Sequence, residues 1–303
     1  MTTSMTLPAP ATGKIGRFGT RQAWLLLYNC QVMGLGNSLN LLSDDIDVEY
    51  YDPNGFRKQA KSILNRLQHY DRILVAPQLE RELGEEWMGN AKVWRIPTIS
   101  FNAYHPDICY LLESGSSLKG PLGDYHSLIA YAAFACGLSE ARALALYRES
   151  VYADLGYFER WDQARTALLG NFTSHGFDIA THFVDWSRNG PFMYSFNHPR
   201  VHCVRDIAKA ILARAGLDPV YRDALPHDNL ANGPVFPVYP EIAARLGVDG
   251  SYLFKLGGKY RFIRLDEFVS ESFRIYRDTP RIGIRPEFAR MLDKAMDAIK
   301  AAQ

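Results

Sequence analysis

Three consecutive residues, Asn29-Cys30-Gln31, follow an apolar run and carry side chains that could do chemistry. Residues 24–28 are continuously apolar, which is typical of a strand buried on both faces, and apolar residues recur at helical spacing over 32–42. Asn29 is a suitable N-cap, so we expect Cys30 in the first turn of a helix. Backbone N–H groups and the helix dipole favour a thiolate there, which makes Cys30 a candidate nucleophile; an inert, packed cysteine is the alternative.

Two histidines, His105 and His198, each precede a proline in a short loop and could reach the end of that strand. One could act as a general base and the other could bind substrate, although a histidine in such a loop is more often structural. Asp107 could orient a histidine or hold a hydroxyl group; alone it would be an ordinary turn carboxylate. Amide side chains able to donate hydrogens to a carbonyl or an oxyanion are Asn29, Gln31 and Asn197.

Basic residues near these motifs could hold the phosphates of a carrier molecule. The candidates are Lys119, in a glycine-rich loop, and Arg200 and Arg205, which follow the Asn-His-Pro segment. A solvated surface is the ordinary alternative for each of them. The sequence contains no G-x-x-x-x-G-K-[ST] phosphate loop, which counts against a kinase or a sulfotransferase built on that loop. It contains no G-x-S-x-G elbow either.

Four short motifs occur in the order and approximate spacing of a known family. They are Asn29-Cys30-Gln31, the Pro-Thr-Ile-Ser-Phe-Asn-Ala-Tyr-His-Pro-Asp segment at 97–107, Gly-Pro-Leu-Gly-Asp-Tyr-His at 120–126, and Phe-Asn-His-Pro at 196–199. Together they resemble the WcbI family of acetyltransferases in capsular polysaccharide biosynthesis, over roughly residues 22 to 215. Each motif is short and weak alone, so the resemblance depends on the ordered set.

The resemblance implies coenzyme A or acetyl-coenzyme A as carrier and a saccharide hydroxyl as acceptor, hence an O-acetyltransferase of capsule or exopolysaccharide assembly. We therefore predict catalytic roles for Cys30, His198, His105 and Asp107. We predict carrier contacts for Asn29, Gln31, Lys119, Tyr125, His126, Asn197, Arg200 and Arg205, although His126 could instead only cap a helix.

The residues leave alternatives open. An acyl-ester hydrolase would use the same strand-corner nucleophile with water as the acceptor, and a non-catalytic saccharide-binding protein would use its aromatic residues, 13% of the chain, to stack on sugars. Within acetyl transfer, Cys30 either carries the acetyl group, which we prefer, or only shapes the helix start while a histidine activates the acceptor directly.

Alternating strand and helix patterns in the N-terminal third must position these residues. Strands are expected at 24–28, 48–51, 70–76 and 92–101, with helices at 32–42, 56–67 and 79–90. This rhythm predicts an α/β fold with a doubly wound, mainly parallel sheet in the N-terminal half and a largely helical remainder. Ligands bind such sheets beyond the carboxyl ends of the strands, which is where Asn29-Cys30-Gln31 falls.

The rest of the chain supports broader expectations. We expect a mobile tail at 1–20 and a single catalytic domain at 21–303, with a helical insertion and a C-terminal helical extension. The glycine-rich segment 114–125 is expected to be a long loop that could cover the site, and no chemistry is expected in 219–303.

Composition limits the class of protein. A formal net charge of +1 argues against nucleic-acid binding through a basic field, and four cysteines without C-x-x-C spacing signal neither a zinc site nor a disulfide framework, so we predict no metal. The sequence shows no stretch of about 20 apolar residues and no secretory leader, so we expect a cytoplasmic protein. Its expected partners are the acyl carrier and the saccharide acceptor, and a homo-oligomer or association with other polysaccharide biosynthesis enzymes stays open.

Overall fold

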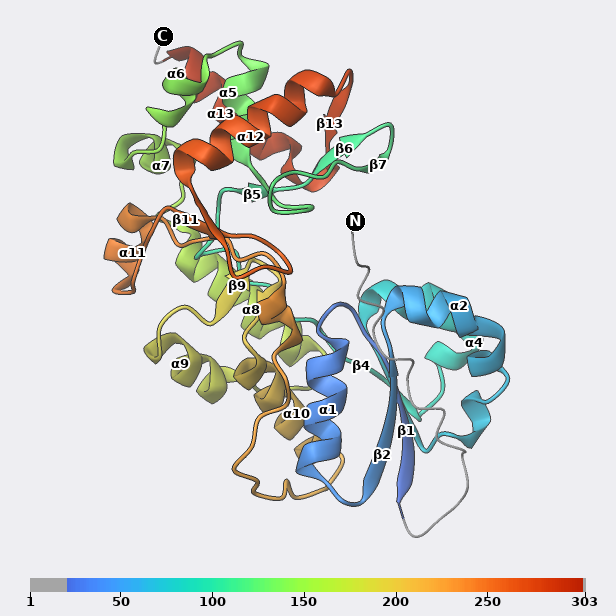
Figure 1. Ribbon diagram of the computed structural model, residues 1–303. Helices are drawn as coiled ribbons and strands as arrows, with labels where there is room; N and C mark the ends of the chain where they lie inside the picture. Colours follow the sequence, from blue (N-terminus) through green and yellow to red (C-terminus); the bar gives the residue numbers. More distant parts are fainter. Residues whose placement is uncertain (1–20, 302–303) are drawn as a thin grey trace.

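A four-stranded parallel sheet forms the N-terminal part of the molecule (Figure 1). The computed structural model describes residues 21–301, so the tail predicted at 1–20 lies outside the described residues. Strands β1 (Gln22–Leu27), β2 (Ile46–Tyr51), β3 (Arg72–Val75) and β4 (Val93–Arg95) lie in the order β2-β1-β3-β4, and every neighbouring pair is parallel. The predicted α/β fold with a parallel, doubly wound sheet is confirmed.

The central strand β1 is buried on both faces, which explains its unbroken apolar sequence. Trp24 and Leu26 belong to the hydrophobic cluster on one face, whereas Leu25 and Leu27 belong to the cluster on the other. This split follows the two-residue period of a strand.

Helices cover the two faces of the sheet. Helix α1 (Val32–Leu42) packs with α10 (Val201–Arg214) on one side, and α2 (Pro53–Leu64) lies on the other (Figure 1). A Cβ atom added at Gly36 would lie 2.3 Å from the Tyr50 ring, so this glycine allows α1 to approach β2 closely.

Several predicted boundaries shift for local reasons. Helix α2 begins before the expected residue 56, because the Asp52 carboxylate accepts a hydrogen bond from Gly55 N at 2.6 Å and proline occupies the first turn. The helix expected at 79–90 is two short helices, α3 (Glu80–Leu83) and α4 (Glu85–Met88), separated at Gly84, where φ is +95°. Strand β4 is shorter than expected, and residues 96–107 continue without regular structure.

The remainder is largely helical, as predicted. Its central helices are α5 (Leu128–Ala135), α6 (Glu140–Leu144), α7 (Glu149–Leu155), α8 (Arg160–Ser174) and α9 (Ala180–Arg188). The C-terminal part adds α11 (Pro240–Leu246), β11 (Leu253–Lys255), β12 (Phe262–Arg264), α12 (Leu265–Asp278) and α13 (Pro286–Ala301). One hydrophobic cluster runs from Trp24 in β1 to Ile299 in α13, so the C-terminal segment packs into the same core as the sheet.

The glycine-rich segment 114–125 is not the free loop that the sequence predicted. Strand β7 (Ser116–Ser117) pairs with β6 (Leu111–Glu113), and β6 also pairs with β13 (Ile282–Ile284). Gly120 and Gly123 form a further bridge. Backbone hydrogen bonds therefore hold this segment as a hairpin against the C-terminal part.

Candidate functional site

Cys30 lies beyond the carboxyl end of β1, in the short connection between β1 and α1. Helix α1 begins at Val32 with Gln31 as its N-cap, so Cys30 lies in the turn before the helix rather than in its first turn. Asn29 does not cap α1; its Oδ1 accepts a hydrogen bond from Gln31 N at 3.0 Å and holds that turn. Cys30 itself is exposed to solvent.

The Gln31 side chain joins three segments of the chain. Its Nε2 donates to the carbonyl oxygens of Ile99, at 2.8 Å, and Asn197, at 3.1 Å, and its Oε1 accepts from Ile99 N at 3.3 Å. Both amide hydrogens are therefore used, and the expectation that Gln31 donates to an oxyanion is not met. Gln31 instead fixes the segments around Ile99 and Asn197 beside the β1 end.

Two tyrosines form the adjoining wall with Asn197. The Tyr125 hydroxyl donates to Asn197 Oδ1 at 2.6 Å, and Asn197 Nδ2 donates to the Tyr110 hydroxyl at 3.0 Å. The two rings stack with centroids 5.8 Å apart, and the Arg285 guanidinium lies 4.6 Å from the Tyr110 ring centroid. We call Asn29, Cys30, Gln31, Tyr110, Tyr125 and Asn197 the Cys30 corner.

The Cys30 thiol is protonated at neutral pH, contrary to the expected thiolate. Although Cys30 is exposed as a residue, protein atoms surround much of its thiol, and this desolvation raises the pKa to about 11. It outweighs the backbone N–H groups of Cys30 and Gln31, which lower the pKa. The corner therefore does not supply the strongly electropositive surroundings that activate a cysteine.

His198 borders the Cys30 corner from β10 (His198–Pro199). Its ring meets the Tyr125 ring edge to face with centroids 5.6 Å apart, and its Nδ1 has no hydrogen-bond partner. Burial lowers the pKa of His198 to about 4, partly opposed by the charge of Asp228, so the ring is neutral at pH 7. Within residues 21–301 no hydrogen bond joins the Cys30 thiol to a histidine.

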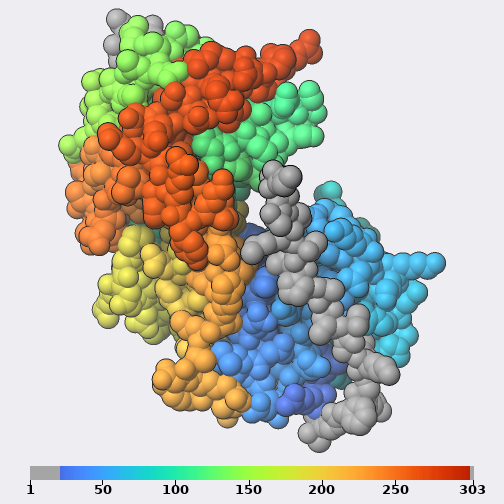
Figure 2. Space-filling model, viewed as in Figure 1, coloured from blue at the N-terminus to red at the C-terminus, as the bar shows by residue number. Residues whose placement is uncertain are grey.

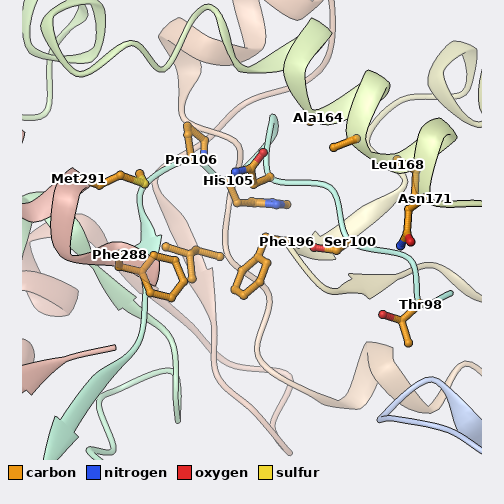
Figure 3. A pocket seen from close by; sticks show the side chains of 13 residues that line it. Thr98, Ser100, His105, Pro106, Ala164, Leu168, Asn171, Phe196, Phe288 and Met291 are labelled. Atoms are coloured by element: carbon orange, nitrogen blue, oxygen red, sulfur yellow. The ribbon is translucent and has the colours of Figure 1, made fainter. Parts of the chain in front are cut away.

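His105 lines a pocket of about 320 Å³ between the segment after β4, helix α8 and the start of α13 (Figure 3). Burial lowers the pKa of this imidazole to about 3, and its Nδ1 has no partner. Phe196 also lines the pocket and contacts the rings of Tyr110 and Tyr125, so it separates the pocket from the Cys30 corner. The two predicted histidines thus lie on different sides of Phe196.

Asp107 does not face either histidine. It is completely buried and accepts hydrogen bonds from the hydroxyls of Tyr157, at 2.9 Å, and Tyr239, at 2.7 Å, and from Ile129 N, at 3.0 Å. Desolvation raises the pKa of Asp107 to about 6, and these donors oppose the rise. Its surroundings indicate a structural anchor for α5 and for the segment around Tyr239 rather than a catalytic carboxylate.

His126 is also a structural residue. Its ring is fully buried, with Nδ1 3.2 Å from the Tyr276 hydroxyl and Nε2 3.0 Å from the Leu118 carbonyl oxygen. Both ring nitrogens therefore have partners inside the protein, and a bound carrier would not reach them.

The three predicted phosphate-binding residues do not gather at the Cys30 corner. Lys119 pairs with Asp124 on the hairpin surface, Arg205 donates to the Arg222 carbonyl oxygen at 2.9 Å, and Arg200, at the start of α10, lies over the Tyr194 ring. Arg200 follows Pro199 directly and is the nearest of them in sequence to His198. Arg285, which the sequence did not single out, lies over a ring of the corner itself.

The described part of the chain contains no helix long and apolar enough to cross a membrane. Across residues 21–301, no three or more histidine, cysteine, aspartate or glutamate side chains are grouped so that they could hold a metal ion.

Comparison with known proteins agrees with the observed fold. The family described as "Polysaccharide biosynthesis enzyme WcbI" matches residues 23–220. A solved structure of WcbI superposes with a TM-score of 0.62 at 13% sequence identity, covering 93% of this chain and 96% of that chain. That structure is described as the native form of a novel polysaccharide biosynthesis enzyme, without a disulfide bond between coenzyme A and one of its cysteines. A search of curated proteins found no match.

Proposed function

Because this chain belongs to the WcbI family of polysaccharide biosynthesis enzymes, we propose that it transfers an acetyl group from acetyl-coenzyme A to a saccharide hydroxyl. The observation that carries this proposal is the exposed Cys30 at the carboxyl end of the parallel sheet, where such folds bind ligands. The similar WcbI structure is described as being without a disulfide bond between coenzyme A and a cysteine of that protein, so the description associates coenzyme A with a cysteine. A disulfide of that kind needs an accessible thiol near the thiol end of the carrier.

Cys30 is the cysteine that best meets this requirement. Cys109 and Cys203 are buried, and Cys136 is half-buried at the end of α5. Cys30 is exposed and lies beside Tyr110 and Tyr125. We therefore expect the thioester end of acetyl-coenzyme A to lie at the Cys30 corner.

The raised pKa of the Cys30 thiol favours direct transfer over a covalent acetyl-cysteine intermediate. In the direct reaction the neutral His198 ring accepts the proton of the saccharide hydroxyl, and that oxygen bonds to the thioester carbonyl carbon. The carbon–sulfur bond then breaks, and the coenzyme A thiolate takes up the proton from His198. Cys30 shapes the site in this route without forming a bond to the acetyl group.

Tyr110 is the group best suited to stabilise the oxyanion of this reaction. Its hydroxyl oxygen accepts a hydrogen bond from Asn197 Nδ2, which leaves the hydroxyl hydrogen free to be donated. Gln31 and the carbonyl oxygen of Asn197 fix the position of that segment from the other side. The corner is therefore held rigidly by groups that do not themselves react.

Isothermal titration of the protein with coenzyme A and with acetyl-coenzyme A tests the proposal. We expect both compounds to bind. In air, free coenzyme A should also form a disulfide with Cys30, which mass spectrometry detects as an increase by the mass of one coenzyme A minus two hydrogen atoms. Cys30→Ser should lose the adduct and keep binding, whereas the control Cys136→Ser should keep both. Absence of binding to either compound would contradict the proposed function.

Turnover separates transfer from hydrolysis and assigns His198. Release of free coenzyme A thiol should depend on an added saccharide, since release without any saccharide would indicate a thioesterase. His198→Ala should bind acetyl-coenzyme A with wild-type affinity but lose about 10²–10⁴-fold in turnover, the usual contribution of a general base. Loss of binding in this variant would instead assign His198 to holding the carrier.

A further inference from the structure

The pocket beside His105 takes no part in the transfer step described above, and one of its walls is polar. Thr98, Ser100 and Asn102 line it from the segment after β4, and Asn171 lines it from α8 (Figure 3). Hydroxyl and amide side chains can each donate and accept hydrogen bonds. This wall therefore suits a ligand whose surface carries several hydroxyl groups.

The opposite wall is apolar. Phe196 and Phe288 lie next to each other, with ring centroids 6.3 Å apart, and Met291 lies beside Phe288 (Figure 3). A pyranose ring has the matching two-sided character, since its hydroxyl groups lie around the rim and its C–H faces pack on aromatic rings. The volume of about 320 Å³ falls in the range of about 300–1,000 Å³ that is common for small-molecule pockets.

Charge distinguishes this pocket from a site for the phosphates of a carrier. None of the thirteen residues that line it is lysine, arginine, aspartate or glutamate. A phosphate placed there would lose its hydration without gaining a counter-charge, which is strongly unfavourable. The pocket therefore suits a neutral ligand.

The His105 imidazole lines this pocket. The residue is only 2% exposed, and its Nδ1 has no hydrogen-bond partner among residues 21–301. The low pKa of this imidazole, about 3, keeps the ring neutral at physiological pH. A neutral imidazole can donate one hydrogen bond and accept another, so a ligand hydroxyl can pair with this ring.

We propose that this pocket binds one neutral pyranose residue of the saccharide acceptor, with its hydroxyl groups toward Ser100 and Asn171 and one of them hydrogen-bonded to the His105 imidazole. The identification of the ligand as the acceptor rests on the proposed acetyl transfer. Binding of a pyranose by this pocket does not depend on acetyl transfer and can be tested without it. His105 and His198 then have different roles on the two sides of Phe196: His105 binds the sugar, and His198 accepts the proton of the reacting hydroxyl.

Saturation-transfer NMR with three neutral probes tests the pocket: methyl α-D-mannopyranoside, methyl β-D-glucopyranoside and methyl β-D-galactopyranoside. We expect saturation transfer to at least one of them in the wild type. Ala167→Phe places a ring at an exposed residue of α8 that lines the pocket, and it should abolish the signal. Thr166→Phe, at an exposed neighbouring residue that does not line the pocket, is the matched control and should keep it.

A second variant and a second ligand complete the test. His105→Phe keeps the volume of the ring but removes Nδ1, and it should also abolish saturation transfer. Coenzyme A titrations should be equal in wild type, Ala167→Phe and Thr166→Phe. A protein that binds coenzyme A but none of the glycosides would refute the sugar pocket while leaving acetyl transfer standing. Loss of coenzyme A binding in Ala167→Phe alone would mean that the pocket holds the carrier, which also refutes it.

Discussion

Cys30 and Asp107 were both expected to carry chemistry, and their surroundings differ in almost every respect. Cys30 lies on the surface at the end of β1, and its thiol has only backbone N–H groups as hydrogen-bond donors. Asp107 is fully buried, and its two oxygen atoms accept three hydrogen bonds from distant parts of the chain. One group is available to a ligand, and the other is fully occupied by the protein.

The contrast between Cys30 and Asp107 gives a criterion that separates ligand-binding from structural polar groups in this fold. A buried polar group stabilises the native state only when all its partners are present, so its surroundings must be complete before any ligand arrives. A ligand-binding group must leave some capacity unused, as Cys30 and the Nδ1 atoms of His105 and His198 do. The predictions below test this separation.

The largest expected effect is on stability at Asp107. Asp107→Ala leaves the hydroxyls of Tyr157 and Tyr239 and the N–H of Ile129 without their acceptor inside the core. We expect the free energy of unfolding to fall by about 3 kcal/mol or more, because each buried donor left unpaired costs about 1–3 kcal/mol. Urea unfolding followed by circular dichroism measures this change.

An exposed aspartate provides the control for Asp107. Asp293→Ala, on the surface of α13, should change the free energy of unfolding by no more than about 0.5 kcal/mol. If Asp107→Ala unfolded like the wild type but lost acetyl transfer, Asp107 would belong with Cys30 as a reactive group and the separation would fail.

The second prediction concerns the pH dependence of stability. A histidine in the unfolded chain takes up a proton near pH 6.5, whereas His105 and His198 stay neutral in the folded protein down to about pH 3 and 4. Lowering the pH from 7 to 5 therefore protonates the unfolded state preferentially and removes about 2 kcal/mol of stability for each histidine. Asp107 opposes this, because its raised pKa of about 6 lets the folded state bind a proton first, which offsets about 1 kcal/mol.

From these three groups we expect a net loss of stability of about 2–3 kcal/mol between pH 7 and pH 5, measured by urea unfolding at several pH values. His198→Gln removes one of the two titrating rings and should reduce the loss to about 1 kcal/mol or less. Equal slopes for the variant and the wild type would show that His198 titrates as in the unfolded chain, and hence that its surroundings are more open than the structure indicates.

The N-terminal sheet could be predicted because local signals agree there with the tertiary structure. Helix α1 has the predicted bounds, and β1 differs from the prediction by a residue or two at its ends, since burial on both faces leaves a continuous apolar run. The β6–β7 hairpin was not predicted, because β6 also pairs with β13, and that pairing joins residues more than 150 positions apart. A glycine-rich composition favours a loop and carries no information about such a distant partner.

Contacts between distant residues were also the part of the site that the sequence did not predict. The sequence placed Asn29, Cys30 and Gln31 at the end of a strand, and the structure agrees. Asn197 was selected from the Phe-Asn-His-Pro motif, and in the structure its carbonyl oxygen accepts a hydrogen bond from Gln31. Their hydrogen bonds could not be foreseen, so Gln31 was assigned to an oxyanion although Ile99 and Asn197 use both its amide hydrogens. Residues from 219 onward looked chemically empty, yet Tyr239 and Tyr276 satisfy Asp107 and His126, because partners of buried groups follow from packing rather than from local motifs.

The smallest expected effect on stability is at Cys30. Cys30→Ser should change the free energy of unfolding by no more than about 0.5 kcal/mol, since the side chain is exposed and has no side-chain partner. Cys203→Ser, in the buried face of α10, should be destabilised by about 1–3 kcal/mol. A hydroxyl costs more to bury than a thiol, and the thiol sulfur lies 3.9 Å from its acceptor, the Phe192 carbonyl oxygen, which is too far for a good hydrogen bond from the shorter serine side chain. Urea unfolding of the two variants compares the exposed and the buried cysteine directly.

Alkylation by iodoacetamide, followed by mass spectrometry, tests the state of the same thiol. We expect Cys30 to be the first cysteine modified, because it is the exposed one, and its rate to rise continuously toward the pKa of about 11. A pKa two units above that of an ordinary thiol makes the thiolate about 100-fold rarer at neutral pH. A rate that levels off below pH 8 would reveal an activated thiolate, and acetyl transfer would then have to proceed through Cys30 itself.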